Sequence, residues 1–367
     1  MAKQPKVSVL IPCYNAEKYL IQCLDSVVNQ TLKDIEIICI NDGSTDNTLD
    51  ILEQYAKKDA RVKIINQKNG GMGRAYNNGL SNATGEYIAI VESDDWVNAD
   101  AFEFLYNLAN KNNADIAKAD YIFFDNDSGV ETSAWSIGLS KNLINRVFCP
   151  TEKNVNILWT GHPSIWTCLY SKKMLDDNNI KFAETPGATF QDMGFKVKTF
   201  VASKRFIYSP YVILHYRKHA NNSDKNNGKV FAVSDVHDDV DKWIDENRPD
   251  LKKVSKIINQ CRFANYSWNL WRLFGKPKNE FKKRFAKEFR KYYESDDLER
   301  AYFDNKTWLK LLGIIYPYNP VYPVLRAFIT ILSPIYKNRI RDGYMVYYLF
   351  NKIIVKKVKL PGWDYKI

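Results

Sequence analysis

Residues 7–48 read VSVLIPCYNAEKYLIQCLDSVVNQTLKDIEIICINDGSTDNT, and this stretch decides the fold class. Two apolar runs of strand length, residues 7–11 and 35–40, flank residues 17–30, whose apolar positions have helical spacing. Apolar runs without polar alternation are typical of strands buried on both faces of a parallel sheet. The stretch therefore predicts a strand, a helix and a second parallel strand joined by a right-handed crossover.

The same alternation continues along the first hundred residues. It predicts helices at 46–58, with Ser44, Thr45 or Asp46 as the cap, and at 73–83, and strands at 62–66 and 87–91. The fold class is thus α/β, with a mostly parallel sheet covered by helices on both faces. Ligands of such sheets bind beyond the carboxyl ends of the strands, so the residues that follow each strand should carry the chemistry.

Composition and charge divide the chain into two parts. The 367 residues are 45% hydrophobic, which supports a packed core and excludes intrinsic disorder. The net charge is +11, but residues 251–367 carry 25 Lys and Arg against 9 Asp and Glu, whereas residues 1–250 carry 28 against 33. A basic tail behind a slightly acidic body predicts an anionic partner for the tail.

The cysteine and histidine content bears on two further classes of protein, those with zinc knuckles and those held by disulfides. Six cysteines without a CxxC pair and four histidines predict neither a zinc knuckle nor a disulfide framework, and they fit reduced thiols in the cytoplasm. The polar residues 1–6 lead directly into a strand, so we expect no signal peptide and no secretion.

Three carboxylates follow the strand at 87–91. Glu92, Asp94 and Asp95 lie within four residues, and their mutual repulsion is costly unless a divalent cation lies among them. A ligand set made of oxygen alone favours magnesium or manganese. The alternative is that residues 93–95 cap a helix that begins near Asn98.

The other strand ends carry weaker signals. Asp42 in NDGS either accepts hydrogen bonds from a ligand or caps the following helix. The glycines at 70, 71 and 73 do not follow the first strand and lack a Walker lysine, which disfavours dehydrogenase and P-loop interpretations. Arg74 opens a helix that carries Asn77 and Asn78, and it either holds a diphosphate or sugar hydroxyl or is a solvated surface residue.

The combination of these motifs is more specific than its parts. Residues 7–48 together with NGGMGRAYNNGLSNATGEYIAIVESDDW (69–96) closely resemble the nucleotide-sugar domain of family 2 glycosyltransferases, which adopt the Rossmann-like GT-A fold. The likeness continues more thinly to residue 225. It implies a domain over 1–225, with a nucleotide-sugar half (1–112) and an acceptor half (113–225), followed by a mainly helical, basic and aromatic region over 226–367.

The resemblance also implies an activity. Family members move a sugar from a nucleoside diphosphate, usually UDP, to an acceptor hydroxyl in a single displacement with inversion. The acceptor would be a glycan or a lipid-linked sugar, and the setting would be the assembly of a bacterial capsule, exopolysaccharide or other surface glycan.

The resemblance implies donor-binding roles for individual positions of this chain. The resemblance assigns the nucleotide base to Pro12, Tyr14, Glu17 and Asp42, and further donor contacts to Gly71, Arg74 and Asn78. The family's D-x-D element appears as Glu92-Ser93-Asp94, in which Asp94 would ligate Mn²⁺ or Mg²⁺ and Asp95 would lie close by. Glu92 departs from the aspartate that the family often has there, which weakens the expectation of metal binding.

Acceptor-side residues come from three later segments. SIWTCLYSKKML (164–175) and PGATFQDMGFKVKTF (186–200) would supply Trp166 and Gln191 for the acceptor and Asp192 as the catalytic base. Family members often have Glu-Asp where this chain has Gln191-Asp192. ILHYRKHANNS (213–223) would supply His215 as a metal ligand and Arg217 and His219 as phosphate contacts.

The basic tail allows two interpretations. FKKRFAKEFRKYY (281–293) places Phe281, Phe285 and Phe289 on one face of an amphipathic helix, which either packs on the catalytic domain or docks on anionic lipid. Trp268, Trp271 and Phe274 follow a helical pattern, and IIVKKVKLPGW (353–363) adds basic residues beside a tryptophan. Prolines interrupt the apolar residues 309–336, so the tract is too short for a spanning helix.

These features predict a cytoplasmic enzyme that is peripheral at the inner face of the bacterial membrane, with a tail that docks membrane or acceptor or forms a homo-oligomer. Three other functions stay open. A nucleotidyltransferase would need a basic glycine-rich loop after the first strand, where this chain has Pro12-Cys13-Tyr14-Asn15. A polyol-phosphate transferase and a non-catalytic polyanion-binding protein are the others, although the clustered carboxylates argue against nucleic acid as a partner of the front domain.

Overall fold

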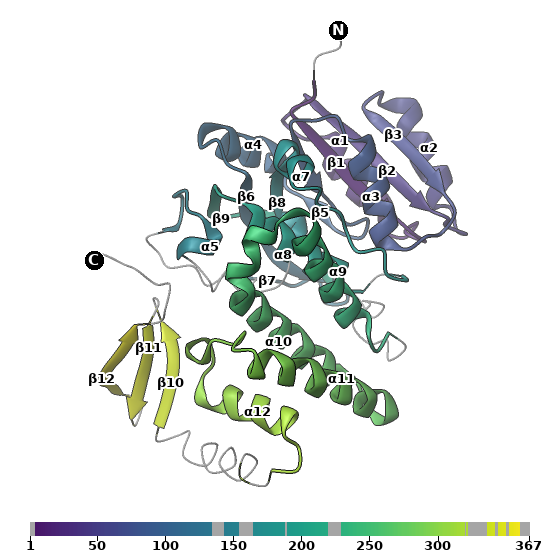
Figure 1. Cartoon of the computed structure of the whole chain (residues 1–367). Coiled ribbons are helices and arrows are strands. Elements are labelled where there is room, and N and C mark those ends of the chain that lie inside the picture. Colours follow the sequence, from purple (N-terminus) through teal and green to yellow (C-terminus); the bar gives the residue numbers. More distant parts are fainter. Residues whose placement is uncertain are drawn as a thin grey trace.

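The computed structural model describes residues 4–133, 143–153, 164–187, 189–218, 229–319, 321, 336–341, 344–349 and 352–359. Its first part is an α/β domain built on one large sheet (Figure 1). The strands of this sheet are β1 (Val7–Cys13), β2 (Ile35–Asp42), β3 (Val62–Gln67), β4 (Tyr87–Ile90), β5 (Trp96–Val97), β6 (Ile116–Asp125), β7 (Glu131–Ser133), β8 (Cys168–Ser171) and β9 (Phe206–Lys218). The helices of this domain are α1 (Leu20–Val28), α2 (Thr48–Lys58), α3 (Met72–Asn82), α4 (Ala101–Lys111), α5 (Pro150–Lys153), α7 (Lys172–Asp177) and α8 (Gln191–Ala202).

The parallel half of the sheet confirms the predicted strands and helices. β1 pairs in parallel with β2 and β4, and β2 pairs in parallel with β3. Every residue of β1 and β2 is buried, as their continuous apolar runs require. Their carboxyl ends therefore meet at one edge, where residues 12–15, 41–44 and 92–95 come together.

The other half of the sheet is mixed. The strand order is β3-β2-β1-β4-β8-β6-β9-β5, and β7 pairs antiparallel with the later part of β6. β8 runs antiparallel to β4 and β6, while β6 and β9 are parallel. The short β5 pairs with β9 and aligns Trp96 with His215, so β9 passes directly beside the carboxylates that follow β4.

A helical region follows the sheet domain. It contains α9 (Ala232–Asn247), α10 (Ser255–Arg272), α11 (Gly275–Glu294) and α12 (Asn305–Ile315), which Figure 1 shows in green at one end of the sheet domain. Phe281, Phe285 and Phe289 of α11 are completely buried, which confirms the interpretation of this stripe as core. Their basic neighbours remain on the surface of the helix.

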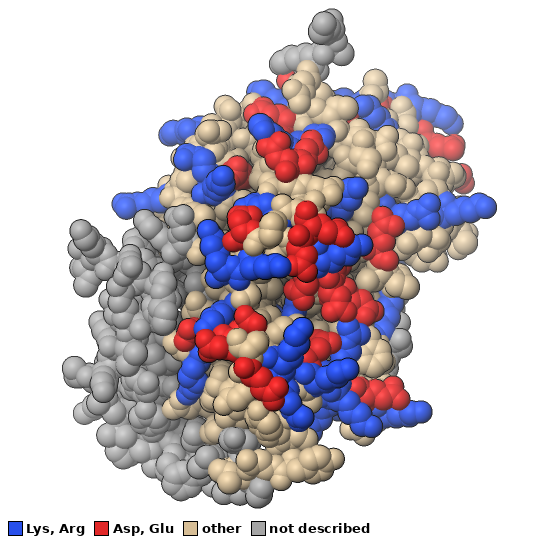
Figure 2. Space-filling view, viewed as in Figure 1, with Lys and Arg blue, Asp and Glu red and all other residues tan. Residues whose placement is uncertain are grey.

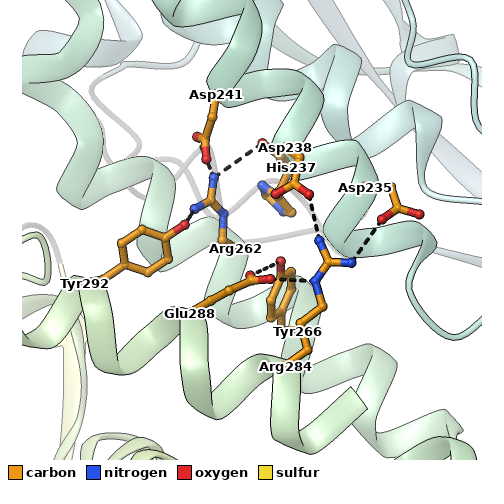
Figure 3. A network of polar contacts seen from close by, with 9 residues as sticks. All are labelled: Asp235, His237, Asp238, Asp241, Arg262, Tyr266, Arg284, Glu288 and Tyr292. Carbon is orange, nitrogen blue, oxygen red and sulfur yellow. Dashed lines mark hydrogen bonds and ion pairs between the residues drawn. The ribbon is translucent and has the colours of Figure 1, made fainter. Parts of the chain in front are cut away.

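A polar network joins three of these helices (Figure 3). Arg262 of α10 is buried and donates to Asp241 of α9 at 2.6 Å and to the hydroxyl of Tyr292 on α11. Arg284 of α11 makes ion pairs with Asp235, Asp238 and Glu288. Tyr266 donates to Glu288 at 2.6 Å. The network fixes α9, α10 and α11 as one unit.

The C-terminal residues depart from the predicted helical character. Strands β10 (Tyr336–Arg341), β11 (Tyr344–Leu349) and β12 (Lys352–Lys359) form a separate antiparallel sheet, so the segment 353–363 enters a strand over its described part. Residues 322–335 of the apolar tract lie outside the described residues. No helix within the described ranges is both long and apolar enough to cross a bilayer.

Charge is mixed over the visible face of the molecule. Figure 2 shows blue and red side chains interspersed on this face rather than one uniform basic area. Acidic residues of α9, among them Asp235, Asp238 and Asp241, pair with basic residues of α10 and α11. Part of the excess positive charge of the tail is therefore neutralised inside the helical region.

Candidate active site

Three carboxylates form the centre of the candidate site. Glu92, Asp94 and Asp95 follow β4, and one oxygen of each lies within 4.8 Å of the others. Asp95 is almost completely buried, at 1% exposure. Its Oδ1 accepts from the backbone N–H of Arg217 at 2.8 Å, and its Oδ2 has no hydrogen-bond partner among the described residues. Ser93 lies half-buried between Glu92 and Asp94.

The electrostatics of the three carboxylates favour a bound cation. Burial, together with the nearby Asp94 and Asp192, raises the pKa of Glu92 to about 8. Burial, Asp94 and Glu92 likewise raise the pKa of Asp95 well above its usual range. A bound divalent cation would relieve this repulsion, and the unpartnered oxygen and all-oxygen ligand set fit magnesium or manganese. The residues present therefore fit the metal that the sequence predicts.

Asp192 lies near this group. It occupies the first turn of α8, which begins after Phe190 in the left-handed conformation (φ 65°). One carboxylate oxygen of Asp192 accepts from the N–H of Met193 at 2.8 Å. Since Asp192 contributes to the raised pKa of Glu92, the fold brings it to the carboxylates, 100 residues away in the sequence.

Gln191 is placed differently from its predicted contact with the acceptor. Its side chain is buried, and its amide donates to the carbonyls of Thr185 and Gly187 and to the Thr185 hydroxyl. Its carbonyl oxygen accepts from the N–H of Thr189 at 2.5 Å. Gln191 therefore holds the loop before α8 in place, because all of these contacts are internal.

Asp42 holds the turn before α3, and its contact with the nucleotide base stays a prediction. Its Oδ1 accepts from Gln67 and from the N–H of Gly70 at 2.8 Å, and its Oδ2 accepts from the N–H of Gly71 at 2.9 Å. The residue that caps α2 is Asn47, so Asp42 is not the helix cap. Asp42 instead fixes the turn that leads into α3.

Gly71 is required at this turn. It has φ +86°, and a Cβ there would lie 3.0 Å from the backbone nitrogen of Gly187. The N–H of Met72 donates to the carbonyl of Gly187 at 3.3 Å. The turn held by Asp42 thus contacts the loop held by Gln191, which joins the donor side of the site to the acceptor side.

The remaining predicted donor residues lie along the same edge of the sheet. Pro12 is buried in the end of β1, and Tyr14 is exposed just beyond it. Glu17 accepts from the backbone and side chain of Asn47, and Asn78 donates to Gln67. Arg74 is exposed on α3 and its side chain lies against Gly70.

Arg217 holds the carboxylate loop through its backbone and its guanidinium. Its buried guanidinium donates to the Asp94 carbonyl at 2.8 Å, to Asn126 at 2.8 Å and to Gln22 at 2.6 Å. It also lies over the rings of Tyr19 and Trp96. Each nitrogen of the guanidinium thus has a partner within the protein, and the phosphate contact of Arg217 stays a prediction.

His215 and Trp166 of the acceptor half are held by contacts with neighbouring side chains. His215 stacks on Trp96, and its two ring nitrogens are paired with Glu131 at 2.8 Å and Asn98 at 2.9 Å. This geometry does not support His215 as a metal ligand. Trp166 is buried between Tyr121 and Tyr216. His219 lies outside the described residues.

Two residues that the sequence did not single out belong to the site. Tyr76 is completely buried on α3, and its hydroxyl lies 3.5 Å from Glu92 Oε1. Gln22 of α1 accepts from Arg217 across the fold. Neither belongs to a strand-end motif, and both reach the site from helices, so no local pattern could have indicated them.

Comparisons with known proteins agree with this architecture. The model of the family described as Glycosyl transferase family 2 matches residues 8–178. The putative glycosyltransferase EpsH of Bacillus subtilis is 34% identical over 220 residues, which cover 59% of this chain and 61% of EpsH. The cholesterol galactosyltransferase of Borreliella burgdorferi is 31% identical over 270 residues, 70% of each chain.

Other relatives match over a shorter part. Glycosyltransferase GlyA of Streptococcus pneumoniae is 42% identical over 130 residues, 35% of this chain and 19% of GlyA. The chain thus spans less than two thirds of GlyA and EpsH. Among solved structures, residues 1–349 of Staphylococcus aureus TarS with UDP-GlcNAc superpose with a TM-score of 0.69 at 20% identity, over 98% of this chain and 100% of that one. This likeness shows the fold.

Proposed function

Because the chain belongs to glycosyltransferase family 2 and has the GT-A fold, we propose that it transfers a sugar from a nucleotide-sugar donor to an acceptor hydroxyl. One observation carries the proposal. Glu92, Asp94 and Asp95 crowd at the carboxyl end of β4, and Asp192 approaches them from α8. A cation-binding group with a further carboxylate near it is the arrangement that a sugar diphosphate and an attacking hydroxyl require.

The donor side of the proposal is a UDP-sugar. Tyr14 and Arg74 are exposed at the edge of the sheet where such ligands bind, and TarS, which shares the fold, is known in complex with UDP-GlcNAc. Asp94, with Glu92 and Asp95 beside it, would hold Mn²⁺ or Mg²⁺, and this cation would neutralise charge on the departing diphosphate. Arg217 fixes the backbone of Asp94 and the carboxylate of Asp95, so it orients this group.

The transfer itself would be a single displacement with inversion. The acceptor oxygen forms a bond to the anomeric carbon as the bond from that carbon to the diphosphate oxygen breaks. The nucleoside diphosphate leaves with the electron pair, and Asp192 takes the proton of the acceptor hydroxyl. A general base of this kind typically contributes on the order of 10²–10⁴ in rate.

The proposed setting is the assembly of a bacterial surface glycan at the inner face of the membrane. The Borreliella relative is named as a cholesterol galactosyltransferase, which combines a hexose with a lipid acceptor. The mixed charge of the visible face argues against attachment through that face.

The donor proposal is tested by thermal unfolding with a panel of nucleotide sugars. UDP-glucose, UDP-galactose, their N-acetyl forms, and GDP- and CDP-linked sugars are each measured with and without Mn²⁺. We expect one UDP-sugar to raise the unfolding temperature, and Mn²⁺ to enlarge the shift. Asp94→Asn should lose the metal-dependent part, whereas the exposed Glu53→Gln on α2 should keep it. No shift with any donor in the wild type would refute the proposal.

A further inference from the structure

A buried lysine lies one helical turn after the proposed base. Lys196 follows Asp192 by four residues in α8, so the two side chains lie on the same face of the helix, with their Cβ atoms about 5–6 Å apart. Lys196 is only 6% exposed, although a lysine is almost never buried to this degree unless it is paired. Its burial therefore indicates a group of opposite charge nearby.

The ammonium of Lys196 has no hydrogen-bond or ion-pair partner within the ranges that the structure describes. It lies 5.6 Å from the ring centroid of Phe200, one turn further along α8. The other buried lysine of this helix differs, because the ammonium of Lys198 donates to Asp239 at 2.5 Å and to the carbonyl of Lys181 at 3.0 Å. Lys196 is thus buried without the contacts that fix Lys198.

Groups from four elements act on the charge of Lys196. They are Cys261 of α10, Lys118 of β6, Cys168 of β8 and Asp192 of α8 itself. Burial is the main cause that lowers the pKa of Lys196, to about 8, so the ammonium stays mostly protonated at neutral pH. Burial also raises the pKa of the Cys261 thiol, which is therefore neutral. The carboxylate among these groups is Asp192.

Asp192 itself benefits from a cation at this distance. A carboxylate must be ionised to accept a proton from a hydroxyl, and an opposite charge within about 4–6 Å favours the ionised form. Asp192 also lies near Glu92, and two carboxylates repel each other. A fixed positive charge on α8 opposes this repulsion.

We propose that Lys196 is a positioning residue of the transfer reaction, whose ammonium is the internal counter-ion of Asp192 and keeps that carboxylate charged for the acceptor hydroxyl. The inference rests on the proposed function and deepens it, because it assigns a residue that acts through the base. An ammonium buried without a hydrogen bond lowers the stability of a fold. Its removal should therefore slow the reaction without destabilising the protein.

The test compares Lys196→Met with Lys198→Met, a matched control on the same helix. Methionine keeps an unbranched side chain and removes the charge. The reaction is the release of nucleoside diphosphate at pH 6 from the UDP-sugar that gives the largest thermal shift, with water as the acceptor. We expect Lys196→Met to lower kcat about tenfold and to leave the KM for the donor unchanged, since the loss of a neighbouring cation raises the pKa of a carboxyl by one unit or more.

A double variant shows whether Lys196 acts through the base. In the Asp192→Asn background, Lys196→Met should cause no further loss of kcat, because no carboxylate is left for the ammonium to act on. A tenfold loss in that background as well would mean that Lys196 acts elsewhere, and the proposal would be wrong.

Thermal unfolding separates this role from a role in folding. Lys196→Met should unfold at or above the temperature of the wild type. Lys198→Met should unfold at least about 2 °C lower, because Asp239 loses its partner, and should keep kcat within about twofold. A lower unfolding temperature for Lys196→Met, or an equal loss of kcat in both variants, would show that Lys196 only supports the packing of α8 and would overturn the proposal.

The wild type distinguishes a failure of this inference from a failure of the proposed function. If the wild type shows no thermal shift and releases no nucleoside diphosphate with any donor, the proposed function fails and the role of Lys196 fails with it. If the wild type is active and Lys196→Met has the same kcat, the assignment of Lys196 alone is wrong.

Discussion

Asp192 stands at the first turn of α8, where a substitution can remove its basicity with little change in shape. In Asp192→Asn the side-chain oxygen can still accept from the N–H of Met193. We therefore expect normal folding and an unchanged donor thermal shift, with transfer reduced by on the order of 10²–10⁴-fold because an amide cannot take the acceptor proton.

The measurement for this variant is the rate of nucleoside diphosphate release with acceptor present. Asp50→Asn, an exposed position on α2, is the matched control and should keep the wild-type rate. Turnover of Asp192→Asn close to the wild type would remove Asp192 from the role of base.

For single residues, the sequence predicts the place of a residue in the fold better than it predicts the hydrogen-bond partners of that residue. Asp42 is indicated by its place at the end of β2, but its partners include the N–H groups of Gly70 and Gly71, 28 and 29 residues away. A motif predicts His215 as a metal ligand, and the fold pairs it with Asn98, which follows β5, and with Glu131 of β7. The local sequence shows the type of a residue and whether it lies at the end of a strand. Which atoms it contacts depends on the pairing of segments that are far apart in the sequence.

The contact between α8 and α9 gives a prediction at the level of elements. A Cβ at Gly194 would lie 2.6 Å from Cγ1 of Val236, which is completely buried and β-branched, so it has few rotamers to adopt. Gly194→Ala should therefore force the helices apart and lower the free energy of unfolding by about 1–3 kcal/mol. Transfer should fall as well, since α8 carries Asp192.

Urea unfolding and steady-state turnover measure the two effects. The double variant with Val236→Ala frees the space, so it should recover turnover relative to Gly194→Ala alone. A single variant that loses less than about 0.5 kcal/mol and keeps full turnover would show that the contact between the helices does not position the base.

Elements of the first hundred residues could be predicted because each is defined by a continuous apolar run or a helical period. The antiparallel order of β8 between β4 and β6 could not, because strand direction depends on chain reversals that leave no periodic signal. Strands β10 to β12 contain charged residues at many positions, as in KIIVKKVK, and this pattern resembled a basic tail more than a sheet.

The whole molecule combines two parts that should respond differently to acid. His237 in the network of the helical region is completely buried, and burial followed by the charge of Arg262 lowers its pKa well below 6.5. An unfolded histidine binds a proton below about pH 6.5 whereas the folded one does not, so stability should decrease as the pH falls through 6.5. The slope contributed by one such group is at most about 1.4 kcal/mol per pH unit.

The carboxyl group of Glu36 in the sheet domain affects the stability of the protein at a lower pH than His237 does. Burial opposes its ionisation, but hydrogen bonds from Lys63, Ser8 and Thr84 outweigh burial and lower its pKa from 4.5 to about 2. The stability contributed by this carboxylate is fully present above pH 4.5 and is lost as the pH falls from 4.5 toward 2. The helical region should therefore lose stability first, and the sheet domain second.

Urea unfolding between pH 7.5 and 3 separates these two windows when variants are compared with the wild type. His237→Gln keeps an acceptor for Asn265 but cannot titrate, so it should flatten the loss between pH 6.5 and 5 and leave the loss below 4.5 unchanged. Glu36→Gln should do the reverse, with a lower stability at neutral pH because the pair with Lys63 is gone. Identical pH slopes for His237→Gln and the wild type would show that this buried ring does not govern the acid response of the helical region.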